Sequence, residues 1–286
     1  MYTLLSQFDI INYNGVPVRN IFTKITFSDL VKKTGAVFYP YTIIEGERPD
    51  TIAYQYYDDP RYSWLVYMSN AMFDPYFDWP LTTNEFNSFI LEKYGQKNLA
   101  MEKILFWRDN WRSDDSVKTT AGYTALTSSN RKYFSPVTGF NNSIVSYVRS
   151  PSDRVADTNK IIQLSVANSS SFSVGDLISQ KTSGVLSGAG EVKFSSNNIV
   201  LINNIQGQFS NTAGNIGALI KNYTFTTTNV TSTNTVSTPI PSDEFVYWEP
   251  VTAYTYETEV NESKRSIKLI DKSYVDQIER ELSELV

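Results

Sequence analysis

The stretch GERPDTIAYQYYDDPRYSWLVYMSN, residues 46–70, contains two short helical patterns separated by a turn at Asp58-Asp59-Pro60. Pro49 suits the first turn of a helix, because that position needs no N–H donor. Ile52 and Tyr56 then follow at helical spacing. In the second pattern Asp59 can cap the N-terminus of the helix, and Pro60 can take the first helical position. The stretch therefore predicts two consecutive short helices.

Strands are predicted on both sides of these helices. Residues 41–44, YTII, form a plausible strand, and Trp79-Pro80-Leu81 resembles a short returning strand after a turn at 73–76. The result is a β-α-α-β unit at about residues 40–82. A third helix follows, because Thr82-x-x-Glu85 is a capping box and Gly95 is a typical stop.

Two shorter signals lie outside this unit. Asn14-Gly15 stands between two apolar runs and predicts a hairpin turn. Residues 104–112, ILFWRDNWR, suit a strand with an aromatic face, and a short helix is the alternative.

The composition changes at about residue 116, where Thr, Ser, Asn and Gly become frequent. Residues 158–225 contain short alternating runs between turn residues, which predicts a small barrel or sandwich. Residues 226–240 are polar and of low complexity, which predicts an extended linker. The hexapeptides at 133–138 and 247–252 share the pattern Tyr-aromatic-x-Pro-Val-Thr. They indicate either a repeated strand flanking an inserted domain, which we favour, or two strand ends of similar chemistry.

The C-terminal residues predict an arm. Residues 261–270 alternate like a strand, and residues 273–286 form an amphipathic helix. Its partner surface is either this protein's own core or another chain, and we expect the arm to reach into a neighbour. The predicted α+β chain thus divides into 1–115, a connecting segment 116–157, a β module 158–225, a linker 226–240 and the arm 241–286.

Composition excludes several functions. The 286 residues include no Cys and no His, which removes thiolate chemistry, disulfides and the commonest general base. A net charge of −5 gives no attraction to nucleic acid or anionic membranes. No apolar run reaches the ~20 residues that span a bilayer. The N-terminus lacks the pattern of a signal peptide, so we expect assembly in the host cytoplasm.

Aromatic residues favour binding between proteins. The chain has 19 Tyr, 16 Phe and 5 Trp, and Tyr and Trp are enriched at interfaces. Many of them, Trp64 among them, are expected in the core. The predicted interface residues are Trp107, Trp111, Trp248, Ile267, Leu269, Ile278, Leu282 and Leu285.

Residues 41–81 resemble a LysM domain, with strand, glycine turn, helix, second helix and closing Asn. The segments GERPDTIA, DPYFDWPL and VNESKRSIKLID further resemble the LysM-like baseplate wedge protein of T-even-type contractile-tailed phages. The resemblance covers about 1–112 and 241–286. It implies a non-enzymatic virion protein that contacts other wedge and hub-proximal proteins and neighbouring wedges.

The LysM likeness also raises the alternative of binding N-acetylglucosamine of peptidoglycan. The loops concerned contain Gly46, Glu47, Arg48, Asp74 and Tyr76. They lack the Gly-Asp-Thr of ordinary LysM domains and a glycine in the second loop, so bulky residues stand where backbone must approach the sugar. These departures argue against glycan binding.

The remaining motifs predict no catalytic, cofactor or metal site. Adjacent carboxylates at 58–59 and 114–115 suit caps and turns better than a glycosidase pair, whose carboxyl groups stand about 5–9.5 Å apart. No stretch has the ligand spacing of a calcium loop. The sequence predicts a scaffold.

Overall fold

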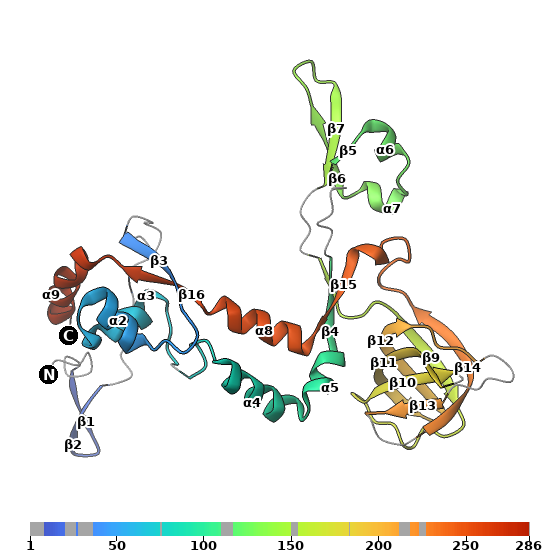
Figure 1. Ribbon diagram of the computed structural model, residues 1–286, viewed down its shortest axis with the longest axis horizontal. Helices are drawn as coiled ribbons and strands as arrows, with labels where there is room; N and C mark the ends of the chain where they lie inside the picture. Colours follow the sequence, from blue (N-terminus) through green and yellow to red (C-terminus); the bar gives the residue numbers. More distant parts are fainter. Residues whose placement is uncertain are drawn as a thin grey trace. The chain divides into compact units, whose positions relative to one another are not determined.

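A computed structural model describes residues 9–20, 27, 37–74, 76–109, 117–149, 154–182, 184–211, 218–222 and 227–285. Helices and strands are mixed along the chain, as an α+β protein requires (Figure 1). The chain forms two compact units. Unit 1 contains Met1–Phe89 and Glu257–Val286, and unit 2 contains Ile90–Tyr256.

The two helices predicted in unit 1 are confirmed. Helix α2 (Pro49–Tyr57) begins at its proline and ends at Asp58, which adopts the left-handed conformation with φ of 65°. The 3₁₀ helix η3 (Pro60–Tyr62) is capped by Asp59, whose side chain accepts a hydrogen bond from the Arg61 amide, and leads into α3 (Ser63–Ser69). Local capping and proline chemistry therefore determine both helix starts.

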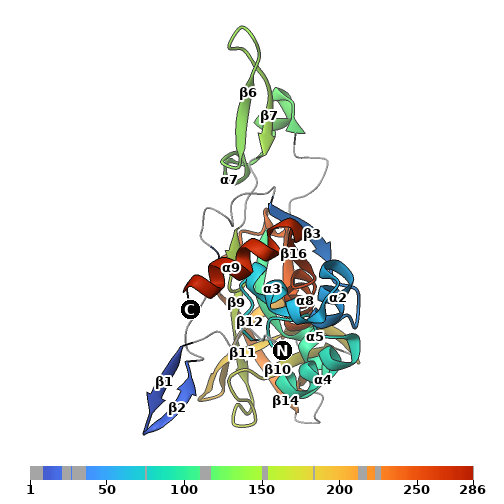
Figure 2. The same ribbon diagram turned by 90° about the vertical axis from the view of Figure 1, so that its left-hand side faces the viewer.

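The strand before these helices is β3 (Phe38–Thr42), which begins and ends earlier than the predicted residues 41–44. Its partner is β16 (Ser266–Ile270), which pairs antiparallel with β3 so that Ile267 lies opposite Tyr41. Figure 2 shows the two strands together. The prediction of a returning strand at 79–81 is wrong, because those residues form no strand and the second strand comes from the C-terminal part of the chain.

Asn70 covers the outer edge of β16. Its side chain donates to the backbone carbonyls of Val66 and Lys268 and accepts from the Lys268 amide, each at 2.8 Å. One amide side chain thus replaces a neighbouring strand at this position.

The core of unit 1 joins β16 to the helices. The prediction that the C-terminal strand reaches into a neighbour is therefore wrong, because β16 fills its own unit. After the strand, η6 (Lys272–Tyr274) leads into α9 (Val275–Leu285). The buried core residues are Ile43, Ile52, Ala53, Tyr57, Leu65, Val66, Ile267, Leu269, Ile270 and Val275.

Two further predictions near the N-terminal end are confirmed. Strands β1 (Ile10–Tyr13) and β2 (Val16–Arg19) form a hairpin around Asn14-Gly15. Helix α4 (Thr83–Tyr94) opens with the capping box, in which the Glu85 carboxylate accepts from the Thr82 amide at 3.0 Å.

Unit 2 contains a three-stranded sheet in the order β15-β4-β8. Strand β4 (Ile104–Asp109) settles the strand-or-helix alternative for residues 104–109. It pairs with β15 (Trp248–Thr252) and with β8 (Val155–Ala156). Helix α5 (Lys97–Glu102) precedes this sheet, and α8 (Ala253–Ser263), which the sequence did not predict, follows β15.

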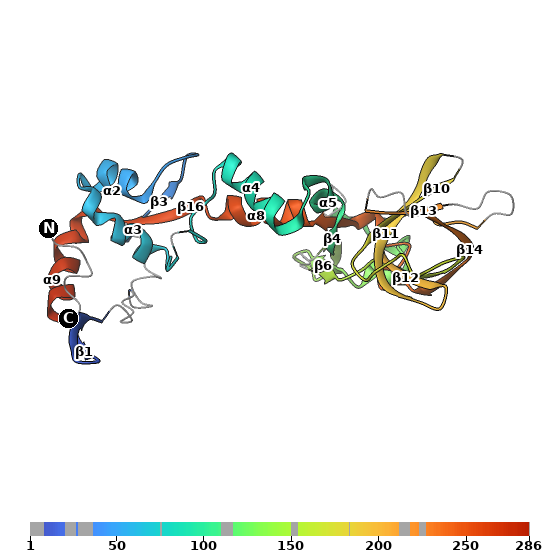
Figure 3. The ribbon, with the colours of Figure 1, turned by 90° about the horizontal axis from the view of Figure 1, so that it is seen from below.

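The part of the chain between β8 and β15 in sequence forms a closed six-stranded barrel, whose strands are seen in Figure 3. Its strand order is β10-β11-β12-β9-β14-β13. The strands are β9 (Ile161–Val166), β10 (Leu177–Thr182), β11 (Val185–Ser196), β12 (Ile199–Gly207), β13 (Ala218–Lys221) and β14 (Thr227–Ser237).

The predicted linker at 226–240 is wrong, because β14 occupies most of it and closes the barrel. Apart from Val236, its exposed residues are polar, while Thr228 and Val230 point inward and are buried. A half-exposed strand needs few apolar residues, so the composition resembled a linker.

Residues 117–149, which we call the lobe, form a second sheet in unit 2. The predicted connecting segment at 116–157 thus contains a folded sheet. Figure 2 shows its β6–β7 hairpin. The sheet order is β5-β7-β6. The lobe's elements are β5 (Val117–Lys118), α6 (Thr120–Thr124), α7 (Ser128–Arg131), β6 (Phe134–Thr138) and β7 (Ile144–Arg149).

Each of the two Pro-Val-Thr hexapeptides contains a strand. The first forms β6 in the lobe, and the second forms β15 in the sheet β15-β4-β8.

Within the described residues, no helix is both long enough and apolar enough to cross a membrane.

Candidate functional site

Unit 1 displays three aromatic side chains on one short loop, residues 73–78. Phe73 is 66% exposed, Tyr76 is 84% exposed and Phe77 is 72% exposed. Soluble proteins rarely expose several large apolar groups together unless the surface binds something. We call these three residues the aromatic loop.

Two aspartates hold the aromatic loop in its conformation. One Asp74 carboxylate oxygen accepts from the backbone amide of Tyr76 at 2.9 Å. One Asp78 oxygen accepts from the amides of Phe73 and Asp74 at 2.9 and 3.0 Å. These backbone hydrogen bonds lower the pKa of Asp78. The Lys264 ammonium donates to the carbonyl of Phe77.

The predicted glycan loops meet each other, because the Trp79 indole N–H donates to the Glu47 carbonyl at 3.0 Å. Gly46 provides the turn with φ of +82°. The Glu47 carboxylate accepts from the Tyr41 hydroxyl at 2.9 Å and from the Ile44 amide at 2.8 Å. Burial, reinforced by Glu47, raises the pKa of Tyr41 to about 12.

The remaining candidates in these loops have local partners. The exposed Arg48 side chain forms an ion pair with Asp50 at 3.3 Å. Asp74 bonds its own turn, as described above, and Tyr76 belongs to the aromatic loop. Glu47 and Asp74 thus shape the two loops through bonds inside the chain.

The predicted interface residues of the C-terminal arm divide into two groups. Ile267 and Leu269 are 2% and 0% exposed and belong to the core of unit 1. Ile278 is partly buried against the same core. Leu282 and Leu285 lie in α9, and their side chains fall outside the described part of the structure.

The predicted tryptophans are placed within unit 2, except Trp111, which lies outside the described residues. Trp107 is 3% exposed, and its indole N–H donates to the Asn204 side-chain oxygen at 3.1 Å. Asn204 lies in β12 and also donates to the Ile104 carbonyl at 3.2 Å. Trp107 therefore attaches β4 to the barrel. Trp248 lines a crevice of about 690 Å³ beside it.

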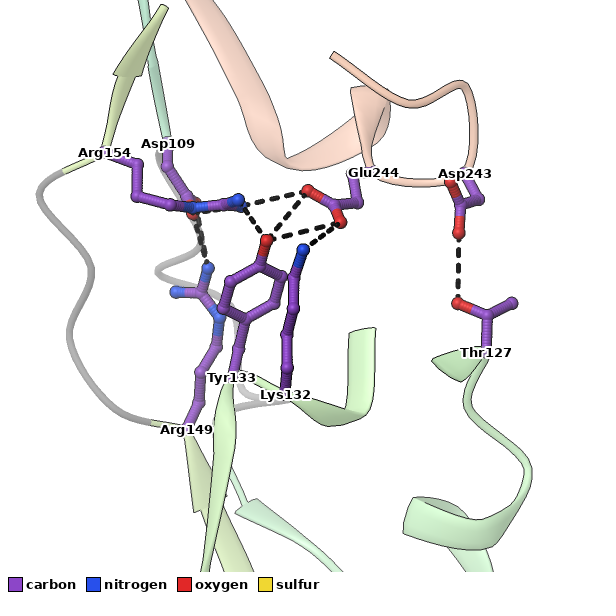
Figure 4. Close-up of polar contacts among 8 residues, drawn as sticks. All are labelled: Asp109, Thr127, Lys132, Tyr133, Arg149, Arg154, Asp243 and Glu244. Atoms are coloured by element: carbon purple, nitrogen blue, oxygen red, sulfur yellow. Dashed lines mark hydrogen bonds and ion pairs between the residues drawn. The ribbon is translucent and has the colours of Figure 1, made fainter. Parts of the chain in front are cut away.

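A cluster of charged side chains lies where the lobe meets β4 and β8 (Figure 4). The buried Arg149 guanidinium, at the end of β7, donates to both oxygens of Asp109 at 2.9 and 2.8 Å. Arg154 donates to the same carboxylate at 3.1 Å. The side chains of Asp109 and Arg149 are 0% and 5% exposed, so the charge-assisted bonds between these two residues act away from water.

The second carboxylate of this cluster belongs to Glu244, which is almost fully buried. It accepts from Arg154 at 3.0 Å and from the Tyr133 hydroxyl at 3.3 Å, and Lys132 lies 3.8 Å away. Burial lowers the pKa of Arg154, but its bonds to Glu244 and Asp109 outweigh that effect and raise it. We call Asp109, Lys132, Tyr133, Arg149, Arg154 and Glu244 the charge cluster.

Sequence reasoning named only Tyr76 of the aromatic loop, as a glycan candidate, and missed Phe73, Phe77 and the charge cluster. The run FDPYFDW did contain a signal for the loop, because aromatic residues alternate there with turn-forming Asp and Pro. No comparable signal marks the charge cluster, whose members come from residues 109–154 and 244.

Unit 1 thus displays aromatic side chains on a loop held by two aspartates, and ion pairs in unit 2 connect separate segments of the chain. Residues 3–110 match the family described as base plate wedge protein 53. The match covers residues 3–110 of the 286-residue chain, so this part of the chain is similar to a phage baseplate wedge protein. The match ends just after β4. No curated protein matches the chain.

Proposed function

We propose that this protein is a non-catalytic scaffold of a contractile-tail baseplate wedge and joins neighbouring wedge subunits through protein contacts made by the aromatic loop. The observation that carries the proposal is the position of this loop. It lies inside the family match at residues 3–110 and exposes Phe73, Tyr76 and Phe77.

The geometry of the loop suits a binding surface. Aromatic side chains bury much area on binding and dominate interface energies. The Asp74 and Asp78 bonds fix the backbone before binding, so less conformational entropy is lost when a partner arrives. A partner with apolar pockets would therefore gain most of its binding energy here.

A non-catalytic role is consistent with the side-chain inventory. The chain has no His or Cys, and two of its buried carboxylates, Asp109 and Glu244, are bonded to arginines. Such ion pairs hold segments together and occupy these two carboxylates.

Glycan binding by the LysM-like unit is the second candidate, favoured by one observation: the Trp79–Glu47 hydrogen bond brings together the two loops that would hold a sugar. Against it, the Glu47 carboxylate already accepts from Tyr41 and Ile44. The two proposals require different ligands and can be separated directly.

The test replaces the aromatic loop with the triple variant Phe73→Ser, Tyr76→Ser, Phe77→Ser. Binding to the other purified wedge proteins of the same phage is measured by analytical ultracentrifugation. Loss of aromatic anchors worth ≥ 2 kcal/mol predicts binding weakened at least ~30-fold. Phe194→Ser, which changes an exposed aromatic on the barrel beyond the family match, is the matched control.

Unchanged assembly of the triple variant, with a circular dichroism spectrum like that of the parent, would contradict the proposal. Isothermal titration with chitooligosaccharides tests the alternative. Saturable heat that Trp79→Phe reduces would favour a sugar site, because that change removes the hydrogen bond between the loops.

A further inference from the structure

The lobe, residues 117–149, has a small packed interior of its own. The rings of Tyr123 and Tyr147 stack with centroids 3.7 Å apart and an interplanar angle of 1°. Tyr123 also packs edge-to-face against the buried Phe134, with ring centroids 6.4 Å apart. Helix α6 thus covers one face of the β5-β7-β6 sheet through Tyr123, and this packing lies within the lobe.

The lobe also has an unusual charge. Residues 117–149 contain no Asp or Glu, whereas they contain Lys118, Arg131, Lys132 and Arg149, in a chain whose net charge is −5. The residues that the lobe meets in the rest of unit 2 include three acids, Asp109, Asp243 and Glu244. Opposite charges therefore face each other across this junction.

Several polar contacts cross the junction. Arg149 donates to Asp109, the Tyr133 hydroxyl donates to Glu244, and Lys132 lies 3.8 Å from Glu244. The Thr127 hydroxyl adds a bond to Asp243 at 3.0 Å (Figure 4).

Arg154 lies at the centre of these contacts, on the side of the junction that belongs to the rest of unit 2. Its guanidinium donates to Asp109 and Glu244 and to the Tyr133 hydroxyl. It also stacks over the Tyr133 ring at 3.9 Å and over Trp248 at 4.9 Å. One side chain thereby links both buried carboxylates to the lobe.

We propose that the charge cluster is an electrostatic latch: Arg154, with Asp109 and Glu244, fixes the orientation of the lobe on the rest of unit 2. Buried ion pairs of this kind are stable while every partner is present and become unfavourable once one is removed. The latch therefore has two states, closed with all charges paired and open with the same groups hydrated. The closed state sets where the hairpin tip at Phe140 points.

Because the lobe has its own interior, opening the latch leaves the lobe and the barrel folded. This separates a latch from an ordinary buried network, whose loss would unfold the unit around it. The proposal concerns the isolated chain and stands independently of any baseplate partner.

The test measures the lobe's orientation in the full-length protein. The chain has no Cys, so Phe140→Cys on the exposed hairpin tip and Lys193→Cys on an exposed barrel position accept a pair of spin labels. Double electron–electron resonance then gives the distribution of distances between them. We expect one narrow distance distribution in the labelled chain that carries no further change. In Arg154→Met and in Glu244→Gln a second population, the open state, should be at least tenfold larger than in that chain.

Arg108→Met is the matched control. Arg108 donates to Glu249 at 2.8 Å between β4 and β15, so this change removes an arginine–glutamate pair that does not involve the lobe. Its distance distribution is expected to stay narrow.

Two results would overturn the latch. One is an unchanged distribution in both Arg154→Met and Glu244→Gln. The other is loss of hydrogen-exchange protection in barrel strand β12 of these variants, which would show that the cluster supports the whole unit.

Discussion

Replacing Leu269 by Ala tests whether the C-terminal strand belongs to the core of its own chain. Leu269 is fully buried in the cluster that joins β16 to α2 and α3. Truncating a buried leucine to alanine costs about 2–5 kcal/mol, through lost transfer energy and the cavity left behind. A central value of ~3 kcal/mol corresponds to a roughly hundredfold rise in the population of the open state.

The assay is hydrogen exchange followed by mass spectrometry on the full-length protein without partners. Peptides from α2 (Pro49–Tyr57) should exchange about a hundredfold faster in Leu269→Ala. Peptides from β12 (Ile199–Gly207), which lies in the other unit, should keep their rates and serve as an internal reference.

Lys268→Ala is the neighbouring control, because the Lys268 side chain is exposed and its backbone bonds to Asn70 remain. A surface change of this kind is expected to stay within about 0.5 kcal/mol. The reasoning would be refuted by Leu269→Ala leaving α2 exchange unchanged, since that would mean that β16 is not part of this core.

Three further changes test other parts of the structure. The pKa of Tyr41 is raised to about 12 in the folded chain from an ordinary value of 10.0. The stability that this pKa shift contributes is therefore complete below pH 10 and is lost as the pH rises toward 12. Tyr41→Phe should therefore flatten the fall of the urea midpoint over pH 10–12, and an equally steep fall would exclude Tyr41, with its Glu47 bond, as the source. Val230→Ala should destabilise the barrel by about 2 kcal/mol in urea titrations, whereas the exposed Val236→Ala on the same strand should have little effect. Thr82→Ala removes the cap of α4 and should cost about 1 kcal/mol in the same assay; an equal stability would show that the capping box is dispensable.

Local chemistry in the sequence determined the helices of unit 1. Pro49 and Asp59 mark the starts of their elements, and the Thr82 capping box with Gly95 delimits α4. These capping signals act within one or two helical turns, so a short stretch of sequence is enough to predict where each helix begins or ends. Alternation likewise predicted short strands within residues 158–225, and β9 (Ile161–Val166) is one of them, with inward and outward residues alternating along it.

Only the tertiary structure decided which segments meet. Strand β3 could pair with any strand of suitable length, and its partner proved to be β16 near the other end of the chain. Strand β14 has the composition of a linker, and barrel closure gives it hydrogen-bond partners on both sides. The charge cluster gathers Asp109, Arg154 and Glu244 from separate segments. Hydrogen bonds between strands and between charged side chains depend on distance in space, which the order of residues alone does not specify.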